Sequence, residues 1–416
     1  MLKRLVMSTA IVMAFGVVVS GCEISINDDS IKGSGKIINE SRQATSFDAI
    51  HNSSPFNVLL IVDGKNSVEV EGDDNFVREV ETAVEDGTLV IRNKRRGNFH
   101  FSWGHNTPTT VKVHVSALKK VTNAGSGDVE IRQRHSDKLD FLNEGSGDVQ
   151  ASGNVGELTF RANGSGDVNF RQLAVKKLDI EMNGSGDTEL GEVGSNLVVQ
   201  INGSGDLNIA KLNSESSKLK MHGSGGINLR GVTKNIEVEM SGSGDLSIDE
   251  IQADMAEITM HGPGEANLAG ETKQLKLKAS GSGNFDASRL KIGNAEIHNS
   301  GPGDLNLKVI KGNLTVDVSG SGDFDADLAD ADKIDIVADG PGSLTLRGSA
   351  KKLTATMNGS GDLHANSLLL ELASVKVNGP GEANVNVKAA NASSDSSTIK
   401  NGSRMVTIDR NGVVKQ

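Results

Sequence analysis

The sequence is poor in residues on which several classes of protein depend. It has one Cys, no Tyr, one Trp and six Pro among 416 residues. A single Cys excludes an intramolecular disulfide and leaves no Cys nucleophile elsewhere in the chain. The net charge is −11 at pH 7 and no long basic segment exists, which argues against nucleic acid as a partner because phosphates would stay unneutralised. The absence of Tyr and the single Trp leave few stacking platforms for sugars.

Glycine, by contrast, is abundant and regularly spaced. Of 49 Gly, 28 belong to fourteen G-x-G turns, whose starting positions rise by 20 and 19 in strict alternation. The turns begin at Gly125, Gly145, Gly164, Gly184, Gly203, Gly223, Gly242, Gly262, Gly281, Gly301, Gly320, Gly340, Gly359 and Gly379. A disordered Gly/Ser linker would not keep such a period, so the spacing indicates a stacked repeat architecture. We expect these glycines to permit positive φ angles and close stacking of successive bends.

Apolar and polar residues alternate on both sides of each turn. Leu178, Ile180 and Met182 precede the fourth turn with polar residues between them, and Leu207 and Ile209 follow the fifth. Alternation with a period of two is typical of a strand with one buried face. No segment of the array has a helical period. The array therefore predicts an all-β fold, a parallel β-solenoid (β-helix) built from fourteen G-[SP]-G half-repeats.

The length of one coil is less directly encoded. Pro replaces the central Ser in every second turn from the eighth onward, at Pro263, Pro302, Pro341 and Pro380. The apolar positions after the turns also vary smoothly when every second turn is compared. We therefore favour seven coils that each contain two half-repeats, a 39-residue coil in which His222 and His261 would be neighbours in one ladder. The alternative is a coil of one half-repeat whose ancestor was duplicated in pairs.

The N-terminus has the pattern of an export signal. "MLKR" is a positive segment, and "LVMSTAIVMAFGVVV" is an apolar run too short for a typical membrane span. "VSGC", which ends at Cys22, resembles the bacterial lipoprotein box. The resemblance implies cleavage before Cys22 and acylation of this residue, so that the membrane is a partner through the lipid anchor. Glu23 then favours the outer membrane. The alternative is a plain secretory signal with an incidental Cys.

These patterns divide the chain into five segments. We expect a lipoprotein signal peptide at 1–21, a flexible polar tether at 22–45 and an N-terminal strand-rich cap of the solenoid at 46–120. The repeat solenoid follows at 121–388, and a C-terminal cap with two Asn-Gly turns at 389–416. Caps are expected at both ends because an open coil would leave unpaired strand edges.

The region that leads into the array resembles a known family. "FDAIHNSSPFNVLLI", then "VEVEGDDNFVREVETAVEDGTLVI", then repeated "NGSGDLNI" units are similar to the putative auto-transporter adhesin, head GIN domain family, over residues 46–388. The resemblance implies a secreted or surface lipoprotein with a β-helical fold and a role in adhesion.

Three features are candidates for binding. The residue after each G-x-G is Asp in nine turns; we interpret it as shaping the bend through backbone amides, with calcium binding as the alternative. His222 and His261 could hold a metal only with a third ligand, which is not evident. "RRGNFHFSWGHN" at 95–106 is a candidate binding loop because it gathers Trp, Phe and Arg.

The function that we predict is binding or support at the bacterial cell envelope. The ligand would be a protein or a glycan, and no catalytic residue, cofactor or metal site is predicted. The alternatives are a carbohydrate-active enzyme on a β-helix and a calcium-binding repeat protein. The only site residue assigned is Cys22, for lipid attachment.

Overall fold

The computed structural model describes residues 31–95, 101–102, 108–389, 395–400, 405–409 and 411–415. The predicted signal peptide, Cys22 and the first part of the predicted tether lie outside these residues. Most of the candidate loop at 95–106 also lies outside them.

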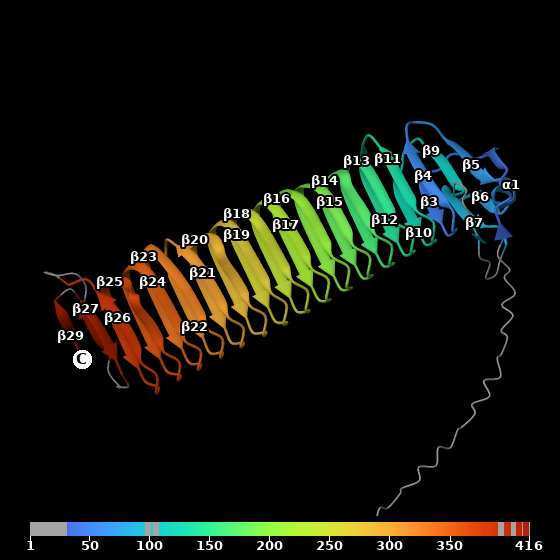
Figure 1. The fold of residues 1–416 in the computed structure, drawn as a ribbon. Coiled ribbons are helices and arrows are strands. Elements are labelled where there is room, and N and C mark those ends of the chain that lie inside the picture. The colour runs from blue at the N-terminus through green and yellow to red at the C-terminus, as the bar shows by residue number, and fades with distance from the viewer. Residues whose placement is uncertain are drawn as a thin grey trace, which may run out of the picture.

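The described chain is a long rod of stacked coils, a parallel β-solenoid of about 13 turns (Figure 1). The all-β solenoid is therefore confirmed. Its strands are β3 (Ala49–Asn52), β4 (Asn57–Val62), β10 (Lys120–Asn123), β11 (Val129–Gln133), β12 (Ser136–Asn143), β13 (Val149–Ala162), β14 (Val168–Met182), β15 (Thr188–Ile201), β16 (Leu207–Met221), β17 (Ile227–Met240), β18 (Leu246–Met260), β19 (Ala266–Ala279), β20 (Phe285–Asn299), β21 (Leu305–Ile310), β22 (Leu314–Val318), β23 (Phe324–Ala338), β24 (Leu344–Met357), β25 (Leu363–Val377) and β26 (Ala383–Val387).

The strand register shows that each G-x-G repeat is one complete coil. Met221 pairs with Met240, and Met240 pairs with Met260, each in parallel strands. A full coil therefore lies between His222 and His261, and Ser241 stands between them in the stack. The 39-residue coil that we favoured is wrong.

The similarity between every second repeat arises at the corner opposite the bends. Successive coils alternate between 20 and 19 residues. In five of the shorter, 19-residue coils, the residue eight positions after the first Gly of the G-x-G bend has a positive φ. These residues are Gly153, Gly231, Gly270, Val309 and Gly348. The longer coils carry one more residue at this corner, where the register shifts, and two of them have a positive φ at Glu250 and Asp330. Two corner types thus alternate along the rod, and residues match best at every second coil.

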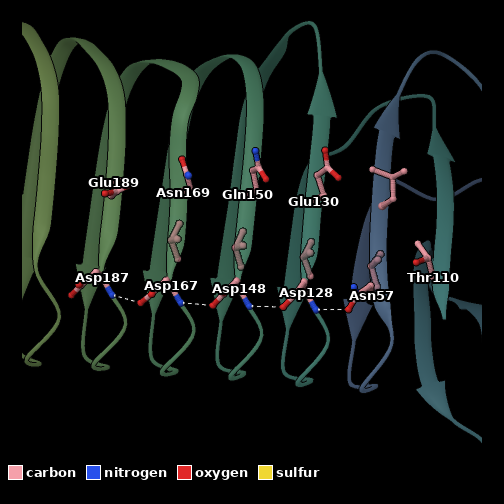
Figure 2. Close-up of a pocket in the computed structure, with 15 residues that line it drawn as sticks. Asn57, Thr110, Asp128, Glu130, Asp148, Gln150, Asp167, Asn169, Asp187 and Glu189 are labelled. Atoms are coloured by element: carbon pink, nitrogen blue, oxygen red, sulfur yellow. Dashed lines mark hydrogen bonds between the residues drawn. The ribbon is translucent and has the colours of Figure 1, made fainter. Parts of the chain in front are cut away.

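The first coil begins earlier than the repeats suggest. β3 pairs in parallel with β10, although Asn52 and its partner Asn123 are 71 residues apart in sequence. β4 pairs in parallel with β11, so that Asn57 lies beside Asp128 (Figure 2). Ser54 takes the place of the first bend Gly, because a Cβ on Gly125 would overlap the carbonyl oxygen of Ser54. Residues 49–62, predicted as part of the cap, are therefore the first coil.

A set of strands with both parallel and antiparallel pairing, together with one short helix, covers this first coil. It contains β5 (Ser67–Asp73), α1 (Asp74–Val77), β6 (Val80–Glu85), β7 (Thr88–Asn93), β8 (Phe101–Ser102) and β9 (Thr110–Val115). β7 and β9 extend the stack in parallel on β3 and β4, and β5 then pairs antiparallel with β9. The change to antiparallel pairing ends the solenoid at this side.

The flexible tether predicted for residues 22–45 is wrong for its second half. β1 (Ile31–Lys32) pairs with β8, and β2 (Ile37–Arg42) pairs antiparallel with β5. Between them, the amide of Gly35 donates to Asp73 Oδ1 at 2.6 Å, and the Ser34 hydroxyl donates to Asp74 Oδ1 at 2.6 Å. An edge strand gains backbone hydrogen bonds without an apolar pattern, so this segment gave no sequence signal.

The last coil is also closed by antiparallel strands. β27 (Asp395–Ile399) pairs with β26, and β28 (Val406–Asp409) pairs with β25 and with β29 (Gly412–Lys415). These strands occupy edges that would otherwise be open to pairing with another chain.

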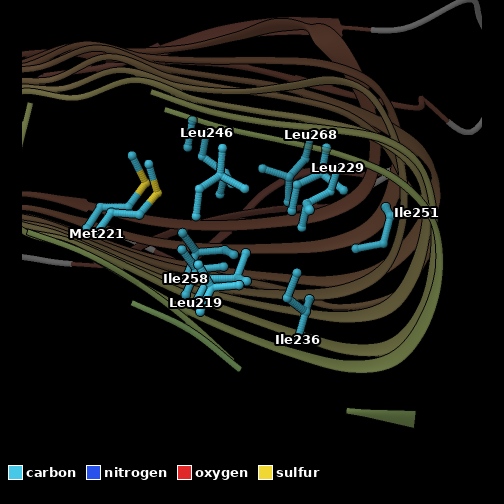
Figure 3. Close-up of a cluster of buried hydrophobic side chains, with 14 of the residues drawn as sticks. Leu219, Met221, Leu229, Ile236, Leu246, Ile251, Ile258 and Leu268 are labelled. Atoms are coloured by element: carbon cyan, nitrogen blue, oxygen red, sulfur yellow. The ribbon is translucent and has the colours of Figure 1, made fainter. Parts of the chain in front are cut away.

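The interior is a narrow apolar core between two long sides (Figure 3). Leu229 and Leu246 line one side, Leu219 and Ile258 line the other, and Ile251 fills the rounded corner. Each of these side chains is at most 3% exposed. Burial of a Leu or Ile contributes about 1.5–3 kcal/mol, so the same contact repeated in every coil dominates the stability.

The bend glycines are required for close stacking. A Cβ on Gly244 would overlap the carbonyl oxygen of Gly225 in the preceding coil. Our prediction that these glycines have positive φ angles is wrong, because the positive φ values of the array lie at the opposite corner. The space between coils, and not the backbone conformation, selects Gly at the bends.

Val309 is strained at that corner, and its replacement by Gly should stabilise the protein. Its φ is 58°, whereas the equivalent positions 231, 270 and 348 are all Gly, with positive φ values of 131°, 128° and 99°. The left-handed conformation costs an L-residue about 1–2 kcal/mol, which the Gly variant avoids. The greater conformational freedom of Gly in the unfolded chain opposes this gain and destabilises the folded state by about 0.5–1 kcal/mol. We expect Val309→Gly to raise the free energy of unfolding by about 0.5–1 kcal/mol, measured by the urea midpoint.

The matched control is Val337, which is exposed on β23 without a positive φ. Val337→Gly should lower the midpoint. Equal losses in both variants would show that the corner of Val309 is not strained.

Candidate functional site: an acidic face beside the bends

Two columns of outward-facing residues follow the bends along the whole rod. The first column directly follows each G-x-G, from Asp128 to Glu382, and the second stands two residues later, from Glu130 to Asn384. Both point away from the core because side chains alternate along a strand. Of these 28 positions, fifteen are Asp or Glu and none is Lys or Arg. We call this surface the acidic face.

The first column forms a hydrogen-bond ladder between coils. The amide of Asp148 donates to Asp128 Oδ1 at 3.0 Å, and the amide of Asp167 donates to Asp148 Oδ1 at 3.0 Å (Figure 2). The ladder starts at Asn57, whose Oδ1 accepts from the amide of Asp128 at 3.0 Å. We expected this Asp to bind amides within its own bend. It instead ties each coil to the next.

The ladder is interrupted where the side chain changes. Among the described residues, no such bond follows Gly226, Glu265 or Ser343, and the ladder begins again from Asp245, Asn284 and Asp362. Gly226 has no side-chain acceptor, and the side chains of Glu265 and Ser343 differ from Asp in length. Asn57 and Asn284 accept the same bond, so the bond needs the geometry of Asp or Asn and does not need the charge.

The nine Asp of this column have no ion-pair partner in the described structure. On the opposite face, acidic residues pair with Lys of adjacent coils, as where Lys218 meets Glu237 at 2.7 Å and Lys177 meets Glu157 at 2.9 Å. The Lys177 hydrogen bond lowers the pKa of Glu157. Adjacent strands are about 4.8 Å apart, and like charges directly opposite each other repel. The two faces therefore differ sharply in charge balance.

A hollow of about 770 Å³ lies on the acidic face at its N-terminal end. Both columns line it over four coils, together with Asn57 of the first coil, Thr110 of β9 and strand residues between the columns (Figure 2). Glu130 and Glu189 have Arg partners at 2.6 and 2.7 Å, so the unpaired charge belongs to the Asp column. The polar side chains of the hollow are Asn57, Thr110, Asp128, Glu130, Asp148, Gln150, Asp167, Asn169, Asp187 and Glu189. It offers mainly hydrogen-bond acceptors to a ligand.

The described residues include no group of three His, Cys, Asp or Glu side chains that could hold a metal ion. One oxygen of each of the nine Asp in the first column is already bonded to an amide, whereas calcium requires six to eight oxygen ligands. His222 Nδ1 lies 2.7 Å from Ser241 Oγ, and His261 Nδ1 lies 2.7 Å from Ser280 Oγ. The two imidazoles are two coil steps apart, so the predicted stacking of His222 on His261 is wrong.

Part of the candidate loop at 95–106 is described. Arg95 Nε lies 3.0 Å from Glu79 Oε1, and Phe101–Ser102 form β8. The acidic face was not identified from the sequence as a site. Its signal, the lack of Lys and Arg at two fixed positions of the repeat, is visible once the repeats are aligned.

The ladder predicts that Asn can replace Asp and Ala cannot. Asp167→Ala removes the acceptor for the amide of Asp187 and should lower the free energy of unfolding by about 1 kcal/mol. Asp167→Asn keeps this acceptor and removes repulsion from two neighbouring carboxylates, so it should leave stability equal or higher. Urea titrations of both variants check this. An Asn variant as unstable as the Ala variant would contradict the ladder.

The fold and its bends define a class of protein, a parallel β-solenoid with glycine bends and an inter-coil Asp ladder. Comparison with family models matches residues 46–231, 192–267, 218–311 and 305–402 to the putative auto-transporter adhesin, head GIN domain family. The chain belongs to this family, which confirms the resemblance found in the sequence. The family indicates a protein of the cell surface or envelope.

Solved structures similar to the chain include three from Bacteroides and Parabacteroides species. A putative adhesin from Bacteroides fragilis is 16% identical over 80% of this chain and 99% of its own, with a TM-score of 0.22. A putative adhesin from Parabacteroides merdae has the same identity and coverage with a TM-score of 0.26. A putative lipid binding protein from Parabacteroides distasonis is 17% identical over 80% and 99%, with a TM-score of 0.30.

These similar proteins are described as putative adhesins or lipid-binding proteins, and not as enzymes. Comparison with curated proteins found no match. No helix in the described residues has the length and apolar character needed to cross a membrane.

Proposed function

We propose that the chain is a lipid-anchored envelope protein that presents the solenoid as a rigid rod and binds a partner through the acidic face. The observation that carries the proposal is the column of Asp side chains without ion-pair partners beside the hollow at the N-terminal end. A protein that needed this face only for stability would gain from Asn at these positions, because Asn57 and Asn284 make the same bond without charge.

The chemistry of the face favours two kinds of group on the partner. Uncompensated carboxylates attract cations over a range of about 10 Å at ordinary salt, and their free oxygens accept hydrogen bonds from hydroxyls. A protein segment with Lys or Arg, or a glycan, fits these properties. Because the same groups recur in each coil along the axis, an extended partner can make equivalent contacts with several coils. The affinity would then be the sum of many weak contacts.

The anchor is proposed on the sequence of the N-terminus. "VSGC" places Cys22 directly after an export signal, and acylation with two or more chains anchors a protein stably. The first described strand begins at Ile31, so the segment from Cys22 to the fold is short. The proposed location is the outer membrane.

Cys22→Ser should release the full-length protein from the membrane. The variant lacks the acylated thiol, so we expect it in the soluble fraction after a high-salt wash and without incorporated palmitate. Membrane fractionation and metabolic labelling measure both. Retention of the variant in the washed membrane would exclude the lipid anchor, whereas binding through the acidic face is decided by a separate experiment.

Removal of charge from the face should weaken adhesion without unfolding the rod. The variant is a quadruple one, Asp128→Asn, Asp148→Asn, Asp167→Asn and Asp187→Asn, which keeps the ladder acceptors. Bacteria that display the full chain would be tested on arrays of glycans and of basic peptides. We expect at least about a tenfold loss of bound cells, since each charge-assisted hydrogen bond contributes about 1.5–3 kcal/mol.

The matched control removes the same number of charges from the opposite face. It combines Asp179→Asn, Glu181→Gln, Glu237→Gln and Glu239→Gln, which are exposed or half-exposed on the strands before the bends. The control should bind as the native protein does. Equal binding by both variants would exclude the acidic face as the binding surface.

A further inference from the structure

A second hollow lies on the opposite face, far from the acidic one in sequence and chemistry. Its volume is about 260 Å³, and its lining is His261, Lys278, Ala279, Ser280, His298, Asn299, Ser300, Asp317 and Ser319. It spans four successive coils between β18 and β22. We call it the serine notch, after Ser280, Ser300 and Ser319, which stand directly before three consecutive bends.

The notch is open because of side-chain size. The position before the bend is a His or Asn in several preceding coils, including His222 and His261. Ser241 is a single small residue between these two His, whereas Ser280, Ser300 and Ser319 place a small hydroxyl in three consecutive coils. The buried floor consists of Ala279 and Asn299, which are 4% and 2% exposed.

The floor has no unmet hydrogen bond of its own. Asn299 Nδ2 donates to the carbonyl of Gly303 at 3.1 Å, and its Oδ1 accepts from the amide of Gly301 at 3.0 Å. The groups that face the opening are different. In the described structure, Lys278 has no ion pair, and the hydroxyls of Ser300 and Ser319 have no side-chain hydrogen bond. Donors are thus available on three successive coils.

The charges of the notch lie at its two ends. Lys278 pairs in register with His298, and His298 pairs with Asp317, so that the Cα atoms of Lys278 and Asp317 are two coil steps apart, about 10 Å. His298 lies between two carboxylates, 3.3 Å from Glu296 and 3.6 Å from Asp317. At the Lys278 end, His261 is held by Ser280 at 2.7 Å.

We infer that the serine notch binds an acidic sugar. Its carboxylate would meet the Lys278 ammonium, and its hydroxyls would donate to Asp317 and exchange hydrogen bonds with Ser300 and Ser319. A bare anion would use only the Lys278 end and would leave Asp317, Ser300 and Ser319 without a ligand hydroxyl. A neutral sugar would leave Lys278 without a partner. The volume suits a monosaccharide unit, and recognition is polar because neither Phe nor Trp lines the notch.

This inference goes beyond the proposed function and does not depend on it. The notch is on the face opposite the Asp ladder, and it needs neither the anchor nor the acidic hollow. Loss of glycan binding in the notch would leave adhesion through the acidic face intact.

The test compares three small ligands by calorimetry or ligand-observed NMR with the purified full chain. They are glucuronate, glucose, which lacks the carboxylate, and acetate, which lacks the hydroxyls. We expect a dissociation constant of about 1 mM for glucuronate, and binding at least about tenfold weaker for the other two. Acetate as tight as glucuronate would indicate a simple anion site and overturn the inference. Glucose as tight as glucuronate, or no saturable glucuronate binding, would overturn it as well.

Two pairs of variants locate the binding. Lys278→Met should weaken glucuronate at least about tenfold, whereas Lys276→Met, on the same strand but paired with Glu296 at 3.9 Å, should not. His261→Gln should weaken it because His261 lines the Lys278 end, whereas His222→Gln should not, although His222 makes the same bond to a Ser. Lys278 is exposed, so its loss should not unfold the chain. Unchanged affinity in Lys278→Met would exclude the notch.

Discussion

The close contact between backbones at the bends is the constraint on which the rest of the structure depends. A Cβ on Gly184 would overlap the carbonyl of Gly164, and a Cβ on Gly186 would overlap that of Gly166. Each bend therefore lies directly on the bend before it. With the bends in line, the two sides of every coil are brought into register at the strand spacing of about 4.8 Å.

Register turns the sequence repeat into columns of like residues. The inward columns give a core in which Phe141, Phe160 and Phe170 pack with ring centroids 5.2–6.2 Å apart. The outward columns give ladders, and these differ between the faces. On one face, charges of opposite sign meet in adjacent coils and pair. On the other, the Asp of the first column recurs, so its hydrogen bonds to amides are satisfied while its charge has no ion-pair partner among the described residues.

This imbalance links the fold to the proposed function. A charge that recurs at the coil spacing is costly to a protein that does not use it, and Asn would supply the same hydrogen bond without repulsion. The acidic face is formed by a residue that recurs in successive coils, whereas the serine notch is formed where the residue of a column changes. There, three consecutive Ser in the column before the bends take the place of larger side chains and leave a small polar hollow.

The sequence by itself determined the class of fold and the contents of each coil, because the Gly spacing and the period-two alternation at Leu178, Ile180 and Met182 leave no other architecture. It misjudged the coil length, since alternate repeats share a corner type and the sequence does not tell a shared corner from direct stacking. Only the tertiary structure decided which segments lie side by side. Ser54 forms a bend without the G-x-G motif, and Lys278 meets His298 only because their coils stack in register. A repeat fixes what each coil contains, whereas stacking fixes which side chains become neighbours, and a binding surface is made of neighbours.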